Sequence, residues 1–186
     1  MASEVELSKI QKVAVIGAGQ AGRRFALRCA LAGFDVTLED VMPANLRRAE
    51  AEFADLSGQG KLAFALTVED AVRDADIAID FVPDELESKL EIFCLIDRMA
   101  PPRTILCTPT ETLSITDLAS CTYRPDRCFA LRGDLAAGGK IHVLHPDHTH
   151  ASLLAQVKEF LSALALEVDA ITDPDLPMLM KNQKIS

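Results

Sequence analysis

Three glycines follow a short apolar run near the start of the chain. Gly17, Gly19 and Gly22 are spaced G-x-G-x-x-G directly after residues 12–16, and Asp40 ends the next apolar run. The first glycine allows a tight turn, the second lets a pyrophosphate approach the main chain, and the third lets a helix pack closely. A carboxylate at Asp40 accepts hydrogen bonds from ribose hydroxyls and repels a 2′-phosphate. The pattern therefore predicts a site for NAD rather than NADP.

Gln20 and Ala21 lie between the second and third glycines. They fall near the start of the expected helix, where main-chain N–H groups lack an intrahelical acceptor and the helix dipole is positive. Phosphate oxygens can accept hydrogen bonds from such groups without a basic side chain. The alternative is a glycine turn in an α/β protein that binds no nucleotide.

Alternating strands and helices are expected to position this loop. Periodicity predicts strands over residues 12–16, 34–39, 62–66, 76–82, 104–107, 128–131, 140–144 and 166–171. Helical patterns fall between them, over residues 21–32, 45–56, 67–75, 85–99, 114–120 and a last stretch that includes 153–164. This order predicts a Rossmann-type α/β fold, with a doubly wound, mostly parallel sheet. We expect a single domain over residues 1–172 and a proline-broken tail over 173–186.

Composition narrows the classes of partner. The chain has 186 residues, 49% of them hydrophobic, and a net charge of −9. Such a charge disfavours nucleic acid and anionic membrane surfaces as partners. No apolar run approaches the roughly 20 residues that span a bilayer. Five cysteines, an odd number without a C-x-x-C pair, read as reduced thiols, mostly in the core. With no apolar signal core near the N-terminus, the expected location is the cytoplasm.

Several ordered segments resemble one known family. KVAVIGAGQAG, VTLED, ADIAIDFVPDELESKLEIFCLID, PPRTILCTPTETLSITDLA and RPDR are similar to the NAD-binding domain of L-3-hydroxyacyl-CoA dehydrogenases, between about residues 12 and 127. The resemblance implies NAD contacts at the glycine loop and Asp40, and a place in fatty acid metabolism. It also implies that Val82, Asp84 and Lys89 lie near the nicotinamide half. For Lys89 the alternative is an ordinary solvated helix lysine.

The sequence departs from the family where the chemistry takes place. Pro109 and Glu111 replace the family's asparagine and substrate-binding serine, and Arg132 falls at the position of its acid/base histidine. Arginine stays protonated, so it cannot accept a hydroxyl proton. The helical arm after the second strand is short, and the family's C-terminal helical domain does not follow. No catalytic residue can therefore be named.

The four histidines are gathered in IHVLHPDHTH, as His142, His145, His148 and His150. They could bind a metal or supply an acid/base, but no established ligand spacing supports a metal. The alternative is a polar loop before the last helix, which Thr149 or Asp147 would cap. Other readings are a reactive or buried Cys107, a Glu111–Asp134 carboxylate pair, and a solvated helix face formed by Arg23, Arg24 and Arg28.

Three hypotheses follow. The first is an NAD-dependent oxidoreductase that transfers hydride between NAD and a 3-hydroxyacyl-CoA or a smaller hydroxy substrate. The second is a catalytically silent module that binds NAD or a partner chain, including another copy of itself. The third, which the glycines and Asp40 oppose, is a Rossmann-shaped interaction protein that binds no nucleotide.

Overall fold

The structure is a computed structural model that describes residues 9–56 and 60–175. Its core is one eight-stranded sheet in the order β3-β2-β1-β4-β5-β6-β7-β8, parallel except for the β6·β7 pair. The strands are Lys12–Ile16 (β1), Asp35–Glu39 (β2), Lys61–Ala65 (β3), Ile77–Asp80 (β4), Ile105–Pro109 (β5), Cys128–Arg132 (β6), Gly139–His145 (β7) and Leu166–Thr172 (β8). The first six strands have the order of a Rossmann fold, as the sequence predicted.

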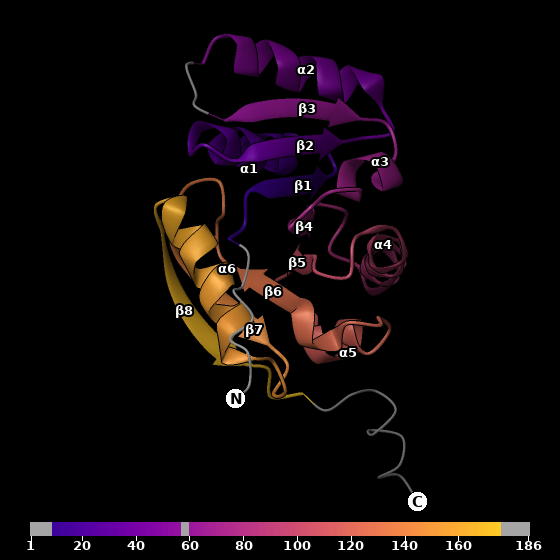
Figure 1. Cartoon of the computed structure of the whole chain (residues 1–186), viewed down its shortest axis with the longest axis vertical. Helices are drawn as coiled ribbons and strands as arrows, with labels where there is room; N and C mark the ends of the chain where they lie inside the picture. The colour runs from indigo at the N-terminus through magenta and orange to yellow at the C-terminus, as the bar shows by residue number, and fades with distance from the viewer. Residues whose placement is uncertain (1–8, 57–59, 176–186) are drawn as a thin grey trace, which may run out of the picture.

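Helices cover both faces of this sheet. They are Gln20–Leu31 (α1), Pro43–Ala54 (α2), Val68–Val72 (α3), Leu86–Met99 (α4), Ile115–Ala119 (α5) and Ala151–Ala163 (α6), with a 3₁₀ turn at Pro125–Arg127. Figure 1 shows α3, α4 and α5 on one side of the strands and α6 on the other. Within the described residues, no helix combines the length and apolar character needed to cross a membrane.

Alternation along the central strands explains why both faces are buried. In β1, Val13 and Val15 enter the core beneath α1, α2 and α6, whereas Ala14 and Ile16 enter the core beneath α3, α4 and α5. Successive side chains of a strand point to opposite faces, so a continuous apolar run suits a strand covered on both sides. The apolar runs therefore located the central strands correctly.

The buried face of helix α4 is not purely apolar. Leu86 is 39% exposed, while the charged residues Lys89 and Asp97 are buried on the same helix. Both have an oppositely charged partner from another segment, which offsets the loss of hydration. A search for apolar periodicity could not identify these positions, because their partners lie elsewhere in the sequence.

The arginines of α1 are not a uniformly solvated face. Arg28 donates to the carbonyl oxygens of Leu164, Leu135 and Ala136, at 2.8, 3.3 and 3.1 Å. It thereby ties α1 to the end of α6 and to the loop after β6. Arg23 is also largely covered and pairs with Glu52 of α2, so the prediction is wrong for both residues.

The cap predicted for α6 is also wrong. The residue at the N-cap position is His150, and it makes no side-chain capping bond. Thr149 and Asp147 precede the cap position and are therefore one and three residues too early in the chain to occupy it.

The residue directly after β8 is held against the rest of the fold by hydrogen bonds. Asp173 is buried, and one carboxylate oxygen accepts hydrogen bonds from Ser114 Oγ at 2.8 Å and Thr116 N at 2.9 Å. Burial raises the pKa of Asp173, but these bonds and one from Asp175 N outweigh it, so the pKa lies below its usual value. The predicted tail therefore begins with a residue anchored to α5; residues 176–186 of that tail lie outside the described part.

We expect Asp173→Asn to lower the free energy of unfolding by about 1–3 kcal/mol at pH 7, because charged hydrogen bonds are lost. A carboxylate whose pKa is lowered by folding stabilises the protein above its unfolded pKa, near 4, and loses this contribution as pH falls through the folded value. Urea unfolding should therefore show a difference in the free energy of unfolding between the variant and the unaltered chain that is smaller below about pH 4 than at pH 7. Glu167→Gln, at an exposed position of β8, is the control. A difference of equal size at both pH values would contradict the charge assigned to Asp173.

Candidate dinucleotide-binding site

The first glycine shapes the turn between β1 and α1. Gly17 has φ +97°, a conformation that side chains strongly disfavour, and its N–H donates to Glu39 O at 2.9 Å. A Cβ at this residue would also lie 3.3 Å from the carbonyl oxygen of Phe81. The turn therefore lies tightly between the ends of β2 and β4.

The third glycine brings α1 against this turn. A Cβ on Gly22 would lie 1.8 Å from the carbonyl oxygen of Gly17, a distance that no side chain can tolerate. The first turn of α1 is therefore in direct main-chain contact with the loop. This is the close packing expected from the G-x-G-x-x-G pattern.

The second glycine has no such explanation within the protein. Gly19 has φ −63° and ψ 179°, which any residue can adopt, and a Cβ there would meet no heavy atom within 4 Å. It caps α1, whose first turn contains no acidic side chain and includes Gln20 and Ala21. The open space in front of these N–H groups fits a pyrophosphate that approaches the main chain.

Asp40 lies beside the N-terminus of α1. Its Oδ2 accepts hydrogen bonds from Ala18 N at 2.9 Å and Asn45 Nδ2 at 3.1 Å, and its Oδ1 accepts one from Met42 N at 2.7 Å. These donors fix the carboxylate beside the glycine loop. A carboxylate has about four acceptor positions, so it can also bind ribose hydroxyls.

Sequence reasoning missed two buried carboxylates beside the loop. Glu39 and Asp80 end β2 and β4, and both are paired in register with Ile16 at the end of β1. Burial raises the pKa of Glu39, and the charge of Asp40 raises it further. Their position as the last residue of a buried strand was the available signal.

Lys89 neutralises one of these carboxylates. Its Nζ lies 2.8 Å from Asp80 Oδ1, and the two side chains are 1% and 0% exposed. The interpretation of Lys89 as a solvated lysine is therefore wrong. Burial raises the pKa of Asp80, and the ammonium of Lys89 opposes this shift. The ion pair fastens α4 to the end of β4.

The loop between β4 and α4 contains the other two residues assigned to the nicotinamide half. Val82 is half-buried and Asp84 is exposed. Asp84 Oδ2 accepts a hydrogen bond from Glu111 N at 3.0 Å, which connects the loop after β4 with the loop after β5. These two loops thus form a continuous wall.

A cavity of about 410 Å³ opens beside this wall. It is lined by Ala21, Phe81, Pro109, Glu111, Gly133, Asp134, Leu135 and Ala136. The lining joins the first turn of α1 to the carboxyl ends of β4, β5 and β6, the edge where α/β sheets bind ligands. The glycine loop and the cavity are therefore parts of one surface.

Glu111 and Asp134 both line the cavity, which brings the two predicted carboxylates to one site. Hydrogen bonds from the N–H groups of Ala137 and Ala136 lower the pKa of Asp134. A lowered pKa makes Asp134 a weak base. Glu111 shares the cavity without these main-chain bonds to its side chain.

Arg132 ends β6 next to the cavity. Its Nη2 donates to Leu113 O at 3.2 Å, and it faces His142 across the antiparallel β6·β7 pair. The described residues that line the cavity include no histidine. Cys107 is buried, and burial raises its pKa well above the ordinary value, which supports the inert-thiol interpretation.

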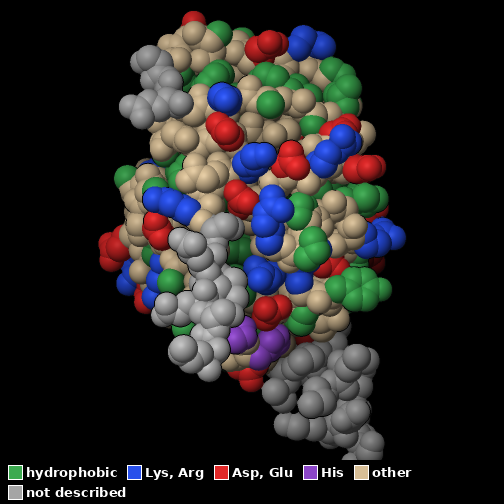
Figure 2. Space-filling model, viewed as in Figure 1, with side chains coloured by type: hydrophobic (Ala, Val, Ile, Leu, Met, Phe, Trp, Pro, Cys, Tyr) green, Lys and Arg blue, Asp and Glu red, His purple; other side chains and the backbone are tan. Residues whose placement is uncertain are grey.

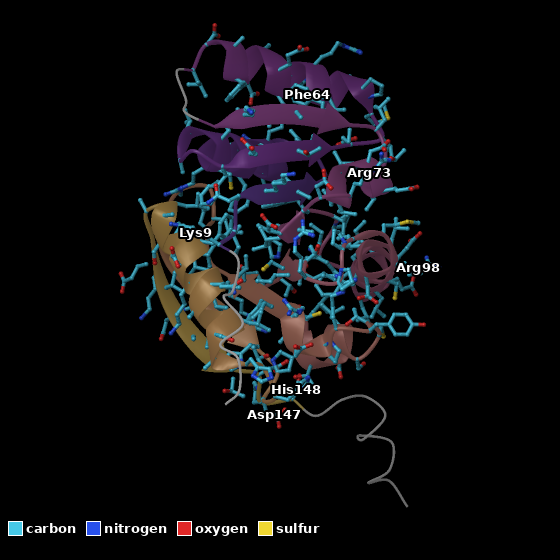
Figure 3. The ribbon with its side chains drawn as sticks, in the orientation of Figure 1. Lys9, Phe64, Arg73, Arg98, Asp147 and His148 are labelled. Atoms are coloured by element: carbon cyan, nitrogen blue, oxygen red, sulfur yellow. The ribbon has the colours of Figure 1, made fainter. Side chains whose placement is uncertain are left out.

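The histidines are spread over β7, the following loop and the start of α6. Figure 2 shows purple side chains gathered at this end, and Figure 3 places His148 beside Asp147, with 3.2 Å between Nδ1 and Oδ1. His142 Nδ1 lies 3.6 Å from Asp169 Oδ2, and His145 Nδ1 lies 2.8 Å from Pro146 O. Within the described ranges, no three His, Cys, Asp or Glu residues form a group able to hold a metal ion.

Comparison with known proteins agrees with this geometry. Residues 12–132 match the family model of the 3-hydroxyacyl-CoA dehydrogenase NAD binding domain. A probable 3-hydroxybutyryl-CoA dehydrogenase of Bacillus subtilis is 34% identical over 66% of this chain and 48% of its own length. An L-carnitine dehydrogenase/betainyl-CoA thioesterase of a Rhizobium species is 36% identical over 66% of this chain and 27% of its own. The chain thus spans half or less of these relatives.

Solved structures extend the similarity beyond residue 132. A diketoreductase structure has a TM-score of 0.79 and 27% identity, covering 90% of this chain and 66% of that one. The (S)-3-hydroxybutyryl-CoA dehydrogenase of Ralstonia eutropha shares the fold, with a TM-score of 0.80 at 21% identity over 89% of this chain and 64% of that one. The family match, the sheet order and the glycine loop together show that this chain belongs to the 3-hydroxyacyl-CoA dehydrogenase family through its NAD-binding domain.

Proposed function

We propose that this NAD-binding chain takes part in hydride transfer between NAD and a 3-hydroxyacyl-CoA or a smaller hydroxy substrate. The observation that carries the proposal is the open space at Gly19, which no contact within the protein explains, beside the fixed carboxylate of Asp40. Relatives named as dehydrogenases of 3-hydroxybutyryl-CoA and L-carnitine support this class of reaction.

We assign the pyrophosphate of NAD to the main chain of Gly17, Gly19, Gln20, Ala21 and Gly22. The positive end of the α1 dipole supports this placement, since no basic side chain is needed there. Asp40 accepts hydrogen bonds from the adenine ribose.

The nicotinamide half extends along the wall formed by Val82 and Asp84 towards the cavity. Lys89 contributes from beneath this wall, because its ion pair with Asp80 holds the start of α4 in place. It is thus a positioning residue for the loop that contains Asp84.

Bound NAD supplies the hydride acceptor, so the residues of this chain must orient the alcohol and receive its proton. Arg132 cannot receive the proton. Main-chain N–H groups already occupy Asp134 Oδ1, so we assign the role of proton acceptor to Glu111, which lines the same cavity. The absence of a histidine from the described lining favours a second candidate function, a catalytically silent NAD-binding module.

We further propose a cytoplasmic location and assembly with a second copy or a partner chain that completes the substrate site. Five cysteines without a disulfide support a reducing compartment. The net charge of −9 supports small-molecule partners over nucleic acid and anionic membranes.

Substitution of Gly19 tests the phosphate site. We expect Gly19→Val to weaken NADH binding at least tenfold, or about 1.4 kcal/mol, because its side chain fills the space assigned to the pyrophosphate. Calorimetric titration measures the affinity. The thermal unfolding midpoint should match that of the unaltered chain, since a Cβ there meets no protein atom. Unchanged NADH affinity in the folded variant would place the phosphates elsewhere.

Substitution of Asp40 tests the ribose contact. The unaltered chain should bind NADH at least tenfold more tightly than NADPH, and Asp40→Asn should reduce this ratio, because the repulsion of a 2′-phosphate is lost. Parallel titrations with both nucleotides give the ratio. Asp35→Asn, at the opposite end of β2, should leave it unchanged. An NADH-to-NADPH affinity ratio that is unchanged in Asp40→Asn would assign the selectivity to another residue.

Turnover separates the two candidate functions. We expect NADH to be oxidised when acetoacetyl-CoA, or acetoacetate as the smaller substrate, is added, which absorbance of the reduced nicotinamide measures. Replacing Glu111 by Gln should reduce this rate by about 10²-fold or more if it handles the proton. No turnover by a chain that binds NADH would instead establish the silent module.

A further inference from the structure

Two cysteines lie together on the side of the sheet remote from the glycine loop. Cys94 is on α4, Cys121 follows α5, and Cys94 Sγ lies 3.6 Å from the carbonyl oxygen of Cys121. Both line a cavity of about 500 Å³ with Arg98, which Figure 3 labels on α4. The lining comes from α4 and the segment after α5, on the face of the sheet opposite α1.

Accessibility separates these two cysteines from the other three. Cys121 is exposed and Cys94 is half-buried, while Cys29, Cys107 and Cys128 are buried. A dissolved oxidant can therefore reach Cys121 and, once Cys121 has reacted, its neighbour Cys94. The three buried thiols serve as internal references within the same molecule.

The proximity of the two cysteines is fixed by neighbouring contacts. Asp97, one helical turn after Cys94, accepts hydrogen bonds from Tyr123 N at 2.8 Å and Arg124 Nε at 2.7 Å. Arg124 Nη2 also donates to Asp97 O at 2.6 Å. This largely buried ion pair holds the segment after α5 against α4. The sulfur of Cys94 therefore stays close to the main chain of Cys121.

Formation of a bond requires the Cys121 sulfur to turn towards Cys94. Cys121 Sγ lies 4.0 Å from the carbonyl oxygen of Asp117, which belongs to α5. Rotation about its Cα–Cβ bond changes the direction of this sulfur, and the Cys94 sulfur already lies against the Cys121 main chain. Disulfides require Cβ atoms about 3.5–4.5 Å apart, so we expect the segment after α5 to shift against α4 as the bond forms.

We propose that Cys94 and Cys121 form a reversible intramolecular disulfide on exposure to a low-molecular-weight disulfide such as oxidised glutathione. The Cys121 thiolate attacks one glutathione sulfur, forming a mixed disulfide and releasing one glutathione thiolate. The Cys94 thiolate then attacks the Cys121 sulfur and releases the second glutathione. Two protein thiols are oxidised, one glutathione disulfide is reduced to two thiols, and the protons pass to the released thiolates.

The structure also supports this order of attack. Burial raises the pKa of Cys94, and the neighbouring Cys121 raises it further, so Cys94 is protonated more often than an ordinary thiol. The exposed Cys121 is then the first nucleophile, and Cys94 the resolving thiol.

The test uses the full chain, reduced, desalted and then incubated with oxidised glutathione. Intact mass should decrease by two hydrogen atoms without a glutathione adduct, and peptide mapping should find Cys94 joined to Cys121. Dithiothreitol should reverse both changes. In Cys94→Ser, Cys121 should retain one glutathione adduct, because the resolving thiol is absent. Cys29→Ala is the matched control, and it should form the bond like the unaltered chain.

Three results would overturn the proposal: a chain that stays fully reduced, separate glutathione adducts on both cysteines, or a crosslink between two chains on a non-reducing gel. The measurement requires neither NAD nor turnover. Its outcome is therefore independent of the proposed function.

Discussion

The site depends on one main-chain contact, the approach of Gly22 to the carbonyl oxygen of Gly17. No side chain fits between them, so α1 packs against the turn and begins after only three loop residues, 17–19. This contact leaves the first N–H groups of the helix facing the space in front of Gly19. It also sets the loop between the ends of β2 and β4, where Glu39, Asp40 and Asp80 converge. Longer spacing would move the positive end of the helix away from the carboxylate of Asp40.

Local rules predicted the features that arise from neighbouring residues. Apolar runs located the central strands because both faces of the sheet are covered, and the glycine spacing identified the loop because a side chain at Gly17 or Gly22 would not fit. The same rules failed for Arg28, which was interpreted as solvated, and they did not reveal the burial of Lys89, for which a solvated side chain was the alternative. Burial of a charge depends on a partner, and Asp80 and the carbonyl oxygens that bind Arg28 lie in other segments. Only the tertiary structure brings these groups together.

Binding of the nucleotide and catalysis of hydride transfer require different groups around the cavity. Backbone amides and one carboxylate suffice for binding, and both are present. Hydride transfer also requires a group that changes its protonation, and Arg132 cannot do so at the end of β6. Sequence comparison could reveal this substitution, but the absence of a histidine from the described cavity lining required the structure. The cofactor site is therefore better defined than the catalytic one.

The buried Asp80–Lys89 pair bears on the geometry of that cavity more than on stability. Two well-packed apolar side chains would stabilise such a position about as well, because removing charges from water offsets much of their attraction. An ion pair, however, fixes a particular separation between the end of β4 and α4. The loop between them contains Asp84, which binds the main chain of Glu111. The pair therefore sets the position of one cavity wall through a chain of contacts, while neither of its side chains needs to reach the ligand.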